Sequence, residues 1–276
     1  MPDSTCAGRP EAGPAVVCVP ALDEEKTIGD VLTQAALCPE VDSAYVVVNG
    51  TTDGTARRVL EVASTIRSAG RTAGRLNIRV RDYGGRLGHD VGRAVAARWA
   101  LAEGAGVLVF LDADFPIPAS DITPFVQAVR GGVDLALNRL TPLVEGWASS
   151  GPVASARRTL NGVLGRPDLG LDSLLSVPHA LSPRAVRLVG YAALAVPPLA
   201  QALAVMAGLD VRSVHTVNTI VANRGTGSGP RPWAGPDMAE LILGDHLQAI
   251  GAVLERRGPR GGFSDLGRDL SVLRAT

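Results

Sequence analysis

Two carboxylates, Asp112 and Asp114, stand one residue apart where the apolar segment 106–111 ends. An ionised carboxylate next to a buried strand is costly unless a cation or a set of donors pairs with it. Adjacent hard oxygen ligands suit Mg²⁺ or Mn²⁺, which bind one or two carboxylates together with substrate phosphate oxygens. The structural alternative is that Asp114 caps the turn before Pro116 while Asp112 accepts hydrogen bonds from backbone amides.

Three further polar segments have residue types that could bind a ligand. "PALDEE" (20–25) is acidic and also fits an ordinary helix start. "NGTTDGT" (49–55) is a turn whose Asn49 and Asp53 could bind a base or ribose, or simply form the turn. "GGRLGHDVGRA" (84–94) is glycine-rich and opens a helix, so its amides could face phosphate. Arg86 or Arg93 could then neutralise a diphosphate, and Asp90 could equally cap the helix.

Alternating strand and helix patterns must position these segments. Apolar runs at 15–22, 43–50, 76–82 and 106–114 predict strands, and amphipathic patterns predict helices at 23–37, 51–69, 90–104 and 118–129. Such alternation predicts a doubly wound parallel sheet with right-handed crossovers. Because ligands bind beyond the carboxyl ends of such strands, all four polar segments are expected at one edge of the sheet.

The second half of the chain is less regular. Strands are predicted at 133–140 and 210–218, and helices within 143–170, from Pro197 to Gly208 and at 237–257, with 171–187 mixed and 222–236 a loop. The uncharged stretch 188–209 is long enough to span a membrane, but Pro197-Pro198 interrupts it, so no span is expected. We expect a disordered lead-in over 1–14, one half over 15–130, and a second half over 131–276 packed on the same domain.

Composition narrows the function classes. The 276 residues carry a formal net charge of zero, which gives no support to a nucleic-acid partner. The three cysteines show no CxxC spacing, so neither a structural zinc site nor a disulfide framework is expected. With no apolar segment near the N-terminus, the chain is expected to be cytoplasmic.

The segments "VVCVPALDEEKTIGDVL", "VVVNGTTDGT", "GHDVGRAVAARWAL" and "VLVFLDADFPI" together resemble family 2-type glycosyltransferases of the GT-A fold, over about residues 15–130. The resemblance implies an α/β fold with a doubly wound, mostly parallel sheet and a smaller acceptor-side C-terminal region. It also implies that a nucleoside diphosphate sugar binds at the strand ends and that Asp112 and Asp114 hold Mg²⁺ or Mn²⁺. The implied donor-binding residues are Pro20, Ala21, Leu22, Glu24, Asn49, Asp53, Gly88, Asp90, Arg93, Asp112 and Ala113.

The chain departs from the family pattern at two places: Asp23 stands where the family has Asn, and Val48-Asn49 replace paired acids. The identity of the base is therefore open. The segments "LNGVLGRPDLG", "LLSVPHALSPRA" and "GYAALAVPPLAQALAVMAGLDVRSVHTVNTIVANRG" resemble, more distantly, glucosyl-3-phosphoglycerate synthases. Those enzymes have a glutamate near the start of the long helix, where this chain has "AVPP" (195–198). They also have a metal-binding histidine where this chain has "VANR" (221–224), which contains no histidine. His215 or His246 could take the place of the histidine.

The predicted reaction is metal-dependent transfer of a sugar from a nucleoside diphosphate sugar to a small-molecule or lipid-linked hydroxyl. Glu145, Asp168 and Asp172 are the candidate catalytic bases, and retention or inversion of configuration is open. A homodimer is compatible with the sequence. One alternative is a sugar nucleotidyltransferase, although acids after the first strand would repel a triphosphate. The other is a non-catalytic relative that binds nucleotide or sugar.

Overall fold

A seven-stranded sheet forms the centre of the computed structural model, which describes residues 13–68, 76–144, 151–219 and 236–273. The spatial order is β3-β2-β1-β4-β6-β5-β7. Strand β6 runs antiparallel to both β4 and β5, and the remaining pairings are parallel. The strands are β1 (Ala15–Ala21), β2 (Ser43–Asn49), β3 (Asn77–Tyr83), β4 (Val107–Phe110), β5 (Leu135–Asn138), β6 (His179–Leu181) and β7 (Val211–His215).

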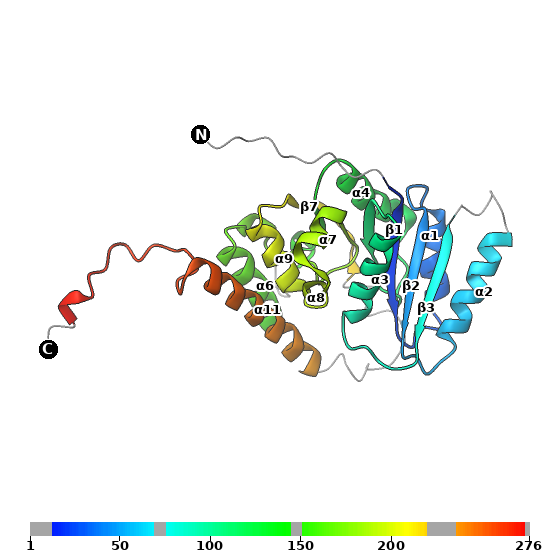
Figure 1. The fold of residues 1–276 in the computed structure, drawn as a ribbon, viewed down its shortest axis with the longest axis horizontal. Coiled ribbons are helices and arrows are strands. Elements are labelled where there is room, and N and C mark those ends of the chain that lie inside the picture. Colours follow the sequence, from blue (N-terminus) through cyan, green and yellow to red (C-terminus); the bar gives the residue numbers. More distant parts are fainter. Residues whose placement is uncertain (1–12, 69–75, 145–150, 220–235, 274–276) are drawn as a thin grey trace.

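Helices cover both faces of this sheet (Figure 1). Helices α1 (Ile28–Leu37), α2 (Thr55–Ser68) and α4 (Ala119–Arg130) share one apolar cluster with the sheet. Helices α3 (Val91–Ala102), α7 (Pro183–Val189), α8 (Tyr191–Leu194) and α9 (Pro197–Met206) share the other. Successive residues of β1 enter opposite clusters, Val17 one and Cys18 the other, so this strand is apolar throughout.

Two more helices, α6 (Pro152–Val163) and α11 (Pro236–Arg257), pack against α9. Leu160, Ala249 and Val253 belong to the small apolar cluster between them. The short elements α5 (Thr141–Val144), η3 (Pro167–Leu169) and η4 (Ser271–Leu273) complete the described secondary structure. Among the described residues, no helix is both long and apolar enough to cross a membrane.

The predicted doubly wound, mostly parallel α/β fold is confirmed, and strands from both halves of the chain join one sheet. Two element boundaries differ from expectation. Strand β4 ends at Phe110, which leaves Asp112 and Asp114 in the bend that follows it, and α1 begins at Ile28 rather than at residue 23. Strand β6 lies inside the segment that was predicted as mixed, because three residues are too few to show an alternating pattern.

The first twelve residues and most of the predicted loop 222–236 lie outside the described residues. The predicted lead-in over 1–14 and the division at residue 130 therefore stay predictions.

Candidate active site

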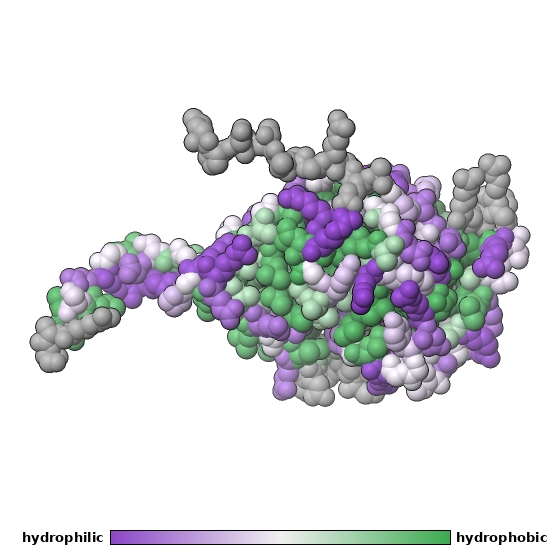
Figure 2. All heavy atoms as spheres, in the orientation of Figure 1, coloured by the Kyte–Doolittle hydropathy of each residue, from purple (hydrophilic) through white to green (hydrophobic). Residues whose placement is uncertain are grey.

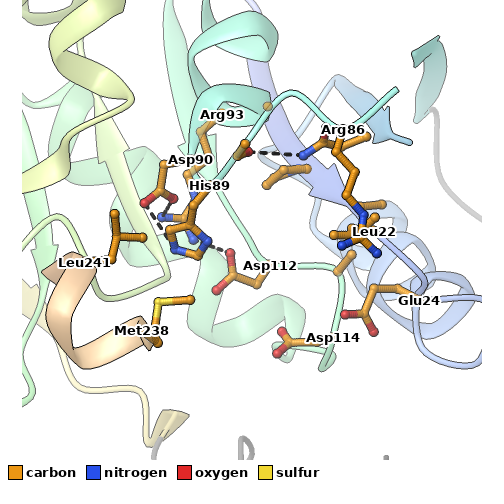
Figure 3. A pocket seen from close by; sticks show the side chains of 16 residues that line it. Leu22, Glu24, Arg86, His89, Asp90, Arg93, Asp112, Asp114, Met238 and Leu241 are labelled. Atoms are coloured by element: carbon orange, nitrogen blue, oxygen red, sulfur yellow. Dashed lines mark hydrogen bonds and ion pairs between the residues drawn. The ribbon is translucent and has the colours of Figure 1, made fainter. Parts of the chain in front are cut away.

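A cavity of about 610 Å³ lies at the carboxyl ends of β1, β2 and β4 (Figure 3). Its size is typical of small-molecule sites. The four polar segments predicted from the sequence all contribute to it, and helix α11 closes one side. The described lining residues are Pro20, Ala21, Leu22, Glu24, Asn49, Arg86, Gly88, His89, Asp90, Gly92, Arg93, Asp112, Ala113, Asp114, Met238 and Leu241.

Arg93 is the partner that Asp112 requires. The guanidinium of Arg93, in the first turn of α3, binds the carboxylate of Asp112 and also lies 2.6 Å from Oδ1 of Asp90. Burial alone would lower the pKa of Arg93, but the two carboxylates outweigh it, so the pKa is raised and the group stays charged. Arg93 therefore offsets one of the two negative charges that Asp90 and Asp112 place in the cavity.

Asp90 is held tightly at the start of α3. Its backbone has a φ of 56°, in the left-handed region that Asp tolerates better than most residues. Its side chain is almost fully buried, and Oδ2 lies 3.4 Å from Nε2 of His89. The predicted alternative, that the Asp90 side chain caps α3 by a hydrogen bond, does not occur. Asp90 instead orients Arg93.

His179, which sequence reasoning missed, lies behind Arg93 in β6. Its ring stacks on Phe110 with centroids 5.0 Å apart, and Nδ1 donates to the carbonyl of Ser176 at 3.1 Å. Burial, together with the charge of Arg93, lowers the pKa of His179 to about 3. The ring is therefore neutral and apolar in character near pH 7, and it backs the guanidinium rather than donating a proton. No sequence signal pointed to this residue, because β6 itself was not predicted.

Asp112 and Asp114 fit a divalent cation. Both line the cavity, and Figure 3 shows their carboxylates on the same side of it. Oδ1 of Asp112 accepts from Arg93, which leaves Oδ2 available to a cation. The described residues contain no cluster of three or more His, Cys, Asp or Glu side chains suited to a metal. Mg²⁺, however, normally binds only one or two protein carboxylates, and substrate phosphate oxygens complete its coordination.

Asn49 holds the glycine-rich loop in place. Its Nδ2 donates to the carbonyl of Gly88 at 3.3 Å, and its Oδ1 accepts from the amide of Leu87 at 2.5 Å. Both ends of the amide are thus used within the protein. These two contacts make Asn49 a positioning residue for the loop. The predicted contact of Asn49 with a base stays a prediction.

Asp53 does not line the cavity. Its carboxylate accepts from the amide of Thr55 at 2.9 Å and from the amide of Glu25 at 3.1 Å, so it caps α2 and ties two loops together. Burial would raise the pKa of Asp53, but these donors and the Thr51 and Thr55 hydroxyls outweigh it and lower the pKa. The structure therefore favours the structural interpretation of the 49–55 turn.

Replacing Asn49 with alanine is expected to weaken binding of a nucleotide about 10-fold, because a loop displaced by about 1 Å no longer presents its amides correctly. The fold should persist, since the strand around residue 49 stays buried. Titration calorimetry with UDP measures the loss, and thermal unfolding checks the fold. Asp53→Ala, which removes a cap outside the cavity, is the matched control and should lower stability more than affinity.

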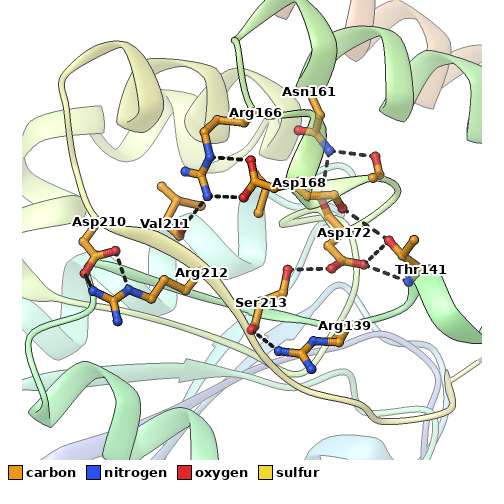
Figure 4. A network of polar contacts seen from close by, with 12 residues as sticks. Arg139, Thr141, Asn161, Arg166, Asp168, Asp172, Asp210, Val211, Arg212 and Ser213 are labelled. Atoms are coloured by element: carbon orange, nitrogen blue, oxygen red, sulfur yellow. Dashed lines mark hydrogen bonds and ion pairs between the residues drawn. The ribbon is translucent and has the colours of Figure 1, made fainter.

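The candidate bases of the second half lie in a separate polar network (Figure 4). Asp172 is buried and accepts from the amides of Leu140 and Thr141, both at 2.8 Å, and from the hydroxyl of Ser213 at 2.5 Å. Asp168 pairs with Arg166 through two contacts of 2.8 and 2.7 Å. Neither is among the described residues that line the cavity, so both fit structural roles better than that of a base.

The two histidine candidates also lie elsewhere. Nε2 of His215 is 3.0 Å from Oδ1 of Asp121. His246 is buried and donates from Nδ1 to the carbonyl of Ile242 at 2.7 Å. Neither lines the cavity among the described residues, and Glu145 lies outside the described residues. Of the second-half candidates that the structure describes, none lies at the Asp112–Asp114 pair.

Helix α11 supplies an apolar wall that the sequence did not reveal. Met238 and Leu241 line the cavity beside Asp90 and His89 (Figure 3). On the next turn of α11, burial and the nearby Asp90 raise the pKa of Asp245. These residues follow Asp114 by more than 120 positions in the chain, and nothing local marks an amphipathic helix as part of a distant site.

The mostly parallel α/β sheet, with a carboxylate pair in the bend after strand β4, agrees with the predicted GT-A fold. Residues 16–141 match the model of glycosyl transferase family 2. The predicted resemblance to that family is thereby confirmed. No curated protein matches the chain.

Solved structures extend the similarity beyond those residues. Glucosyl-3-phosphoglycerate synthase from Mycobacterium tuberculosis with bound UDP matches with a TM-score of 0.56 and 22% identity, over 98% of this chain and 89% of that one. The same enzyme with Mn²⁺, UDP-glucose and phosphoglyceric acid gives 0.55 and 22%, over 98% and 86%. A mycobacterial protein gives 0.55 and 22%, over 96% and 80%. At this identity the likeness establishes the fold, across both halves of the chain.

Proposed function

We propose that this chain transfers a sugar from a nucleoside diphosphate sugar to a hydroxyl acceptor, with a divalent cation held by Asp112 and Asp114. The proposal rests on one observation: four segments at strand ends line the same cavity, and this carboxylate pair lies inside it. The match of residues 16–141 to a glycosyltransferase family supports the same reaction class.

The cavity has two ends of different character, which suggests how a donor lies in it. Leu22, Glu24 and Arg86 form one end and would contact the nucleoside (Figure 3). The start of α3 and the loop around Gly88 would face the diphosphate, because amides at a helix N-terminus favour anions. The sugar would then lie toward Asp90 and Leu241. A bound cation would neutralise charge that develops on the departing diphosphate.

Arg93 makes this arrangement electrostatically reasonable. Three aspartates, Asp90, Asp112 and Asp114, line the same part of the cavity, and without a cation they would repel a diphosphate. The guanidinium contacts Asp90 and Asp112 and offsets one of the three negative charges. Only part of the negative charge is then left for the divalent cation to balance.

The neighbouring solved structures indicate which ligands to test first. One of them binds UDP, and another binds Mn²⁺, UDP-glucose and phosphoglyceric acid. UDP-glucose and Mn²⁺ are accordingly our first candidates for donor and cation. We favour a hydroxyl group of a small molecule as the acceptor, and a lipid-linked hydroxyl is the alternative. We also propose that the enzyme is cytoplasmic.

Titration calorimetry with UDP-glucose, in the presence and absence of Mn²⁺, tests the proposal. We expect tighter binding with Mn²⁺ and slow release of UDP from the donor. Heat without any product would indicate the non-catalytic relative instead. Binding of a nucleoside triphosphate in preference to every sugar nucleotide would indicate the nucleotidyltransferase, and no binding of any nucleotide would refute the proposal.

A further inference from the structure

His89 is the only imidazole among the described residues that line the cavity. Its side chain is 45% accessible, so a ligand in the cavity can contact it. Transfer of a sugar to a hydroxyl needs a group that accepts the hydroxyl proton, and histidine is the side chain that most often does so near neutral pH. Asp168 and Asp172, the described candidate bases, lie away from the cavity.

The carboxylates of the cavity are less suited to this step. The described lining residues include four of them: Glu24, Asp90, Asp112 and Asp114. Asp90 and Asp112 are bound to Arg93, and Asp114 belongs to the pair that we propose for the cation. Glu24 lies at the nucleoside end, whereas His89 lies at the other end, where the sugar is proposed to bind (Figure 3).

The backbone on both sides of His89 has an uncommon conformation. Gly88 and Asp90 both have positive φ angles, of 101° and 56°. The carbonyl of Gly88 accepts from Nδ2 of Asn49 at 3.3 Å, and the carbonyl of His89 accepts from the amide of Val91 at 2.7 Å. A non-glycine residue such as Asp90 keeps a positive φ only where its surroundings hold it, and such residues cluster at functional sites. The loop therefore presents the imidazole from a fixed position.

Asp90 also selects the tautomer of the ring. Its Oδ2 lies 3.4 Å from Nε2 of His89, while its Oδ1 lies 2.6 Å from the guanidinium of Arg93. A carboxylate beside Nε2 favours a proton on that nitrogen, which leaves the lone pair on Nδ1. Nδ1 makes no hydrogen bond within the described part of the chain. It is therefore available to a hydroxyl group in the cavity.

We propose that His89 is the general base of the sugar transfer, an inference that rests on the proposed function. Nδ1 takes the proton of the acceptor hydroxyl while the hydroxyl oxygen forms its bond to the anomeric carbon of the sugar. The bond from that carbon to the diphosphate oxygen breaks, and its electron pair leaves with the diphosphate. The imidazolium then releases the proton to solvent. Because a protein base serves attack on the face opposite the leaving group, the configuration at the anomeric carbon is inverted.

The charges around His89 come from three parts of the fold. Asp90 and Arg93 lie at the start of α3, Asp245 lies on α11, and Asp112 follows β4. Burial and Asp90 raise the pKa of Asp245, and His89 partly opposes them. This interaction is mutual, so the Asp245 carboxylate favours the protonated imidazole. A base must be neutral to accept a proton, so the rate should be lost as the pH falls through the range in which histidines titrate.

Hydrolysis of UDP-glucose with Mn²⁺ tests this role, because water can take the place of the acceptor. His89→Gln should slow the release of UDP about 100-fold or more and leave the affinity for UDP within about two-fold. The rate of the parent chain should rise between about pH 6 and 8, and that of the variant should not. Asp245→Asn should move the midpoint of the parent profile to lower pH, because it removes a charge that favours the imidazolium.

His215→Gln is the matched control. It removes a half-buried imidazole that lies 3.0 Å from Asp121, and His215 is not among the described lining residues. It should change neither the rate nor the pH profile. Exposed apolar side chains lie along residues 264–273 (Figure 2), so a mild detergent is included to prevent nonspecific association. Thermal unfolding verifies that every variant is folded.

The anomer released first gives a second readout. Inversion at the α-linked glucose of UDP-glucose yields β-glucose, which NMR detects before the anomers equilibrate. Release of α-glucose would overturn the inference, as would equal rates for the parent chain and His89→Gln. A matching loss of UDP affinity and rate in His89→Gln would instead make His89 a ligand of the diphosphate.

Two outcomes separate this inference from the proposed function. UDP binding without any hydrolysis by the parent chain would reject the base, since an available base activates water as well, and would leave the nucleotide site standing. The absence of binding by every sugar nucleotide tested would refute the proposed function, and the inference with it.

Discussion

Replacing Asp114 with asparagine is expected to lower kcat about 100-fold or more and to abolish the effect of Mn²⁺ on nucleotide affinity. The carboxylate lies in the cavity beside Asp112, whose Oδ1 is already bound to Arg93. Asp114 is one of the two carboxylates that we propose hold a cation on a diphosphate. Donor turnover, and calorimetry of UDP with and without Mn²⁺, measure the two effects.

Asp30→Asn serves as the control for this variant, because it removes an exposed carboxylate from α1 outside the cavity. It should change neither turnover nor the response to Mn²⁺. Circular dichroism establishes that both variants are folded. Undiminished turnover by a folded Asp114→Asn variant would contradict the metal role of this residue, whatever the identity of the donor.

Replacing Arg93 with methionine is expected to lower the free energy of unfolding by about 3 kcal/mol, because removing one partner leaves buried charges uncompensated. Asp90 would lose its contact of 2.6 Å and Asp112 its only guanidinium partner in the described structure. Urea denaturation measures the change. Affinity for a diphosphate should fall as well, since the cavity would then be strongly negative.

Two comparisons separate this effect from a general loss of an arginine. Arg57→Met breaks the exposed pair with Glu25, whose partners are 72% and 41% accessible, and should cost less than about 1 kcal/mol. The double variant Arg93→Met with Asp112→Asn removes both charges and should recover part of the stability. If Arg93→Met were no more destabilising than Arg57→Met, the ion-pair cluster would not be a stability element.

The fold of the first half follows from short-range patterns. Strands such as β1 are buried on both faces and therefore read as continuous apolar runs, and each is followed by a helix with 3.6-residue periodicity. The edge at which Asp112, Asn49 and Gly88 meet is then fixed by topology, because parallel strands point their carboxyl ends the same way. This is why most of the cavity lining from the first half of the chain was predictable.

The roles of the candidate residues in the second half could not be predicted in the same way. Asp172 was a reasonable candidate base by residue type, yet its oxygens accept from backbone amides and hydroxyls of two other segments, residues 140–141 and Ser213. Asn49 similarly binds a loop nearly forty residues away. Sequence indicates which side chains have the right chemistry, but long-range packing decides whether their polar atoms are available to a ligand.

The reversed direction of β6 has a consequence for how the site can diversify. In a purely parallel sheet, only loops that follow strands reach the ligand edge. Because His179 at the start of β6 pairs with Phe110 at the end of β4, the loop that precedes β6 arrives at that same edge. Residues 176–178 thus adjoin the Asp112 bend, and substitutions there would change the surroundings of Asp112 while strands β1, β2 and β3 stay in place.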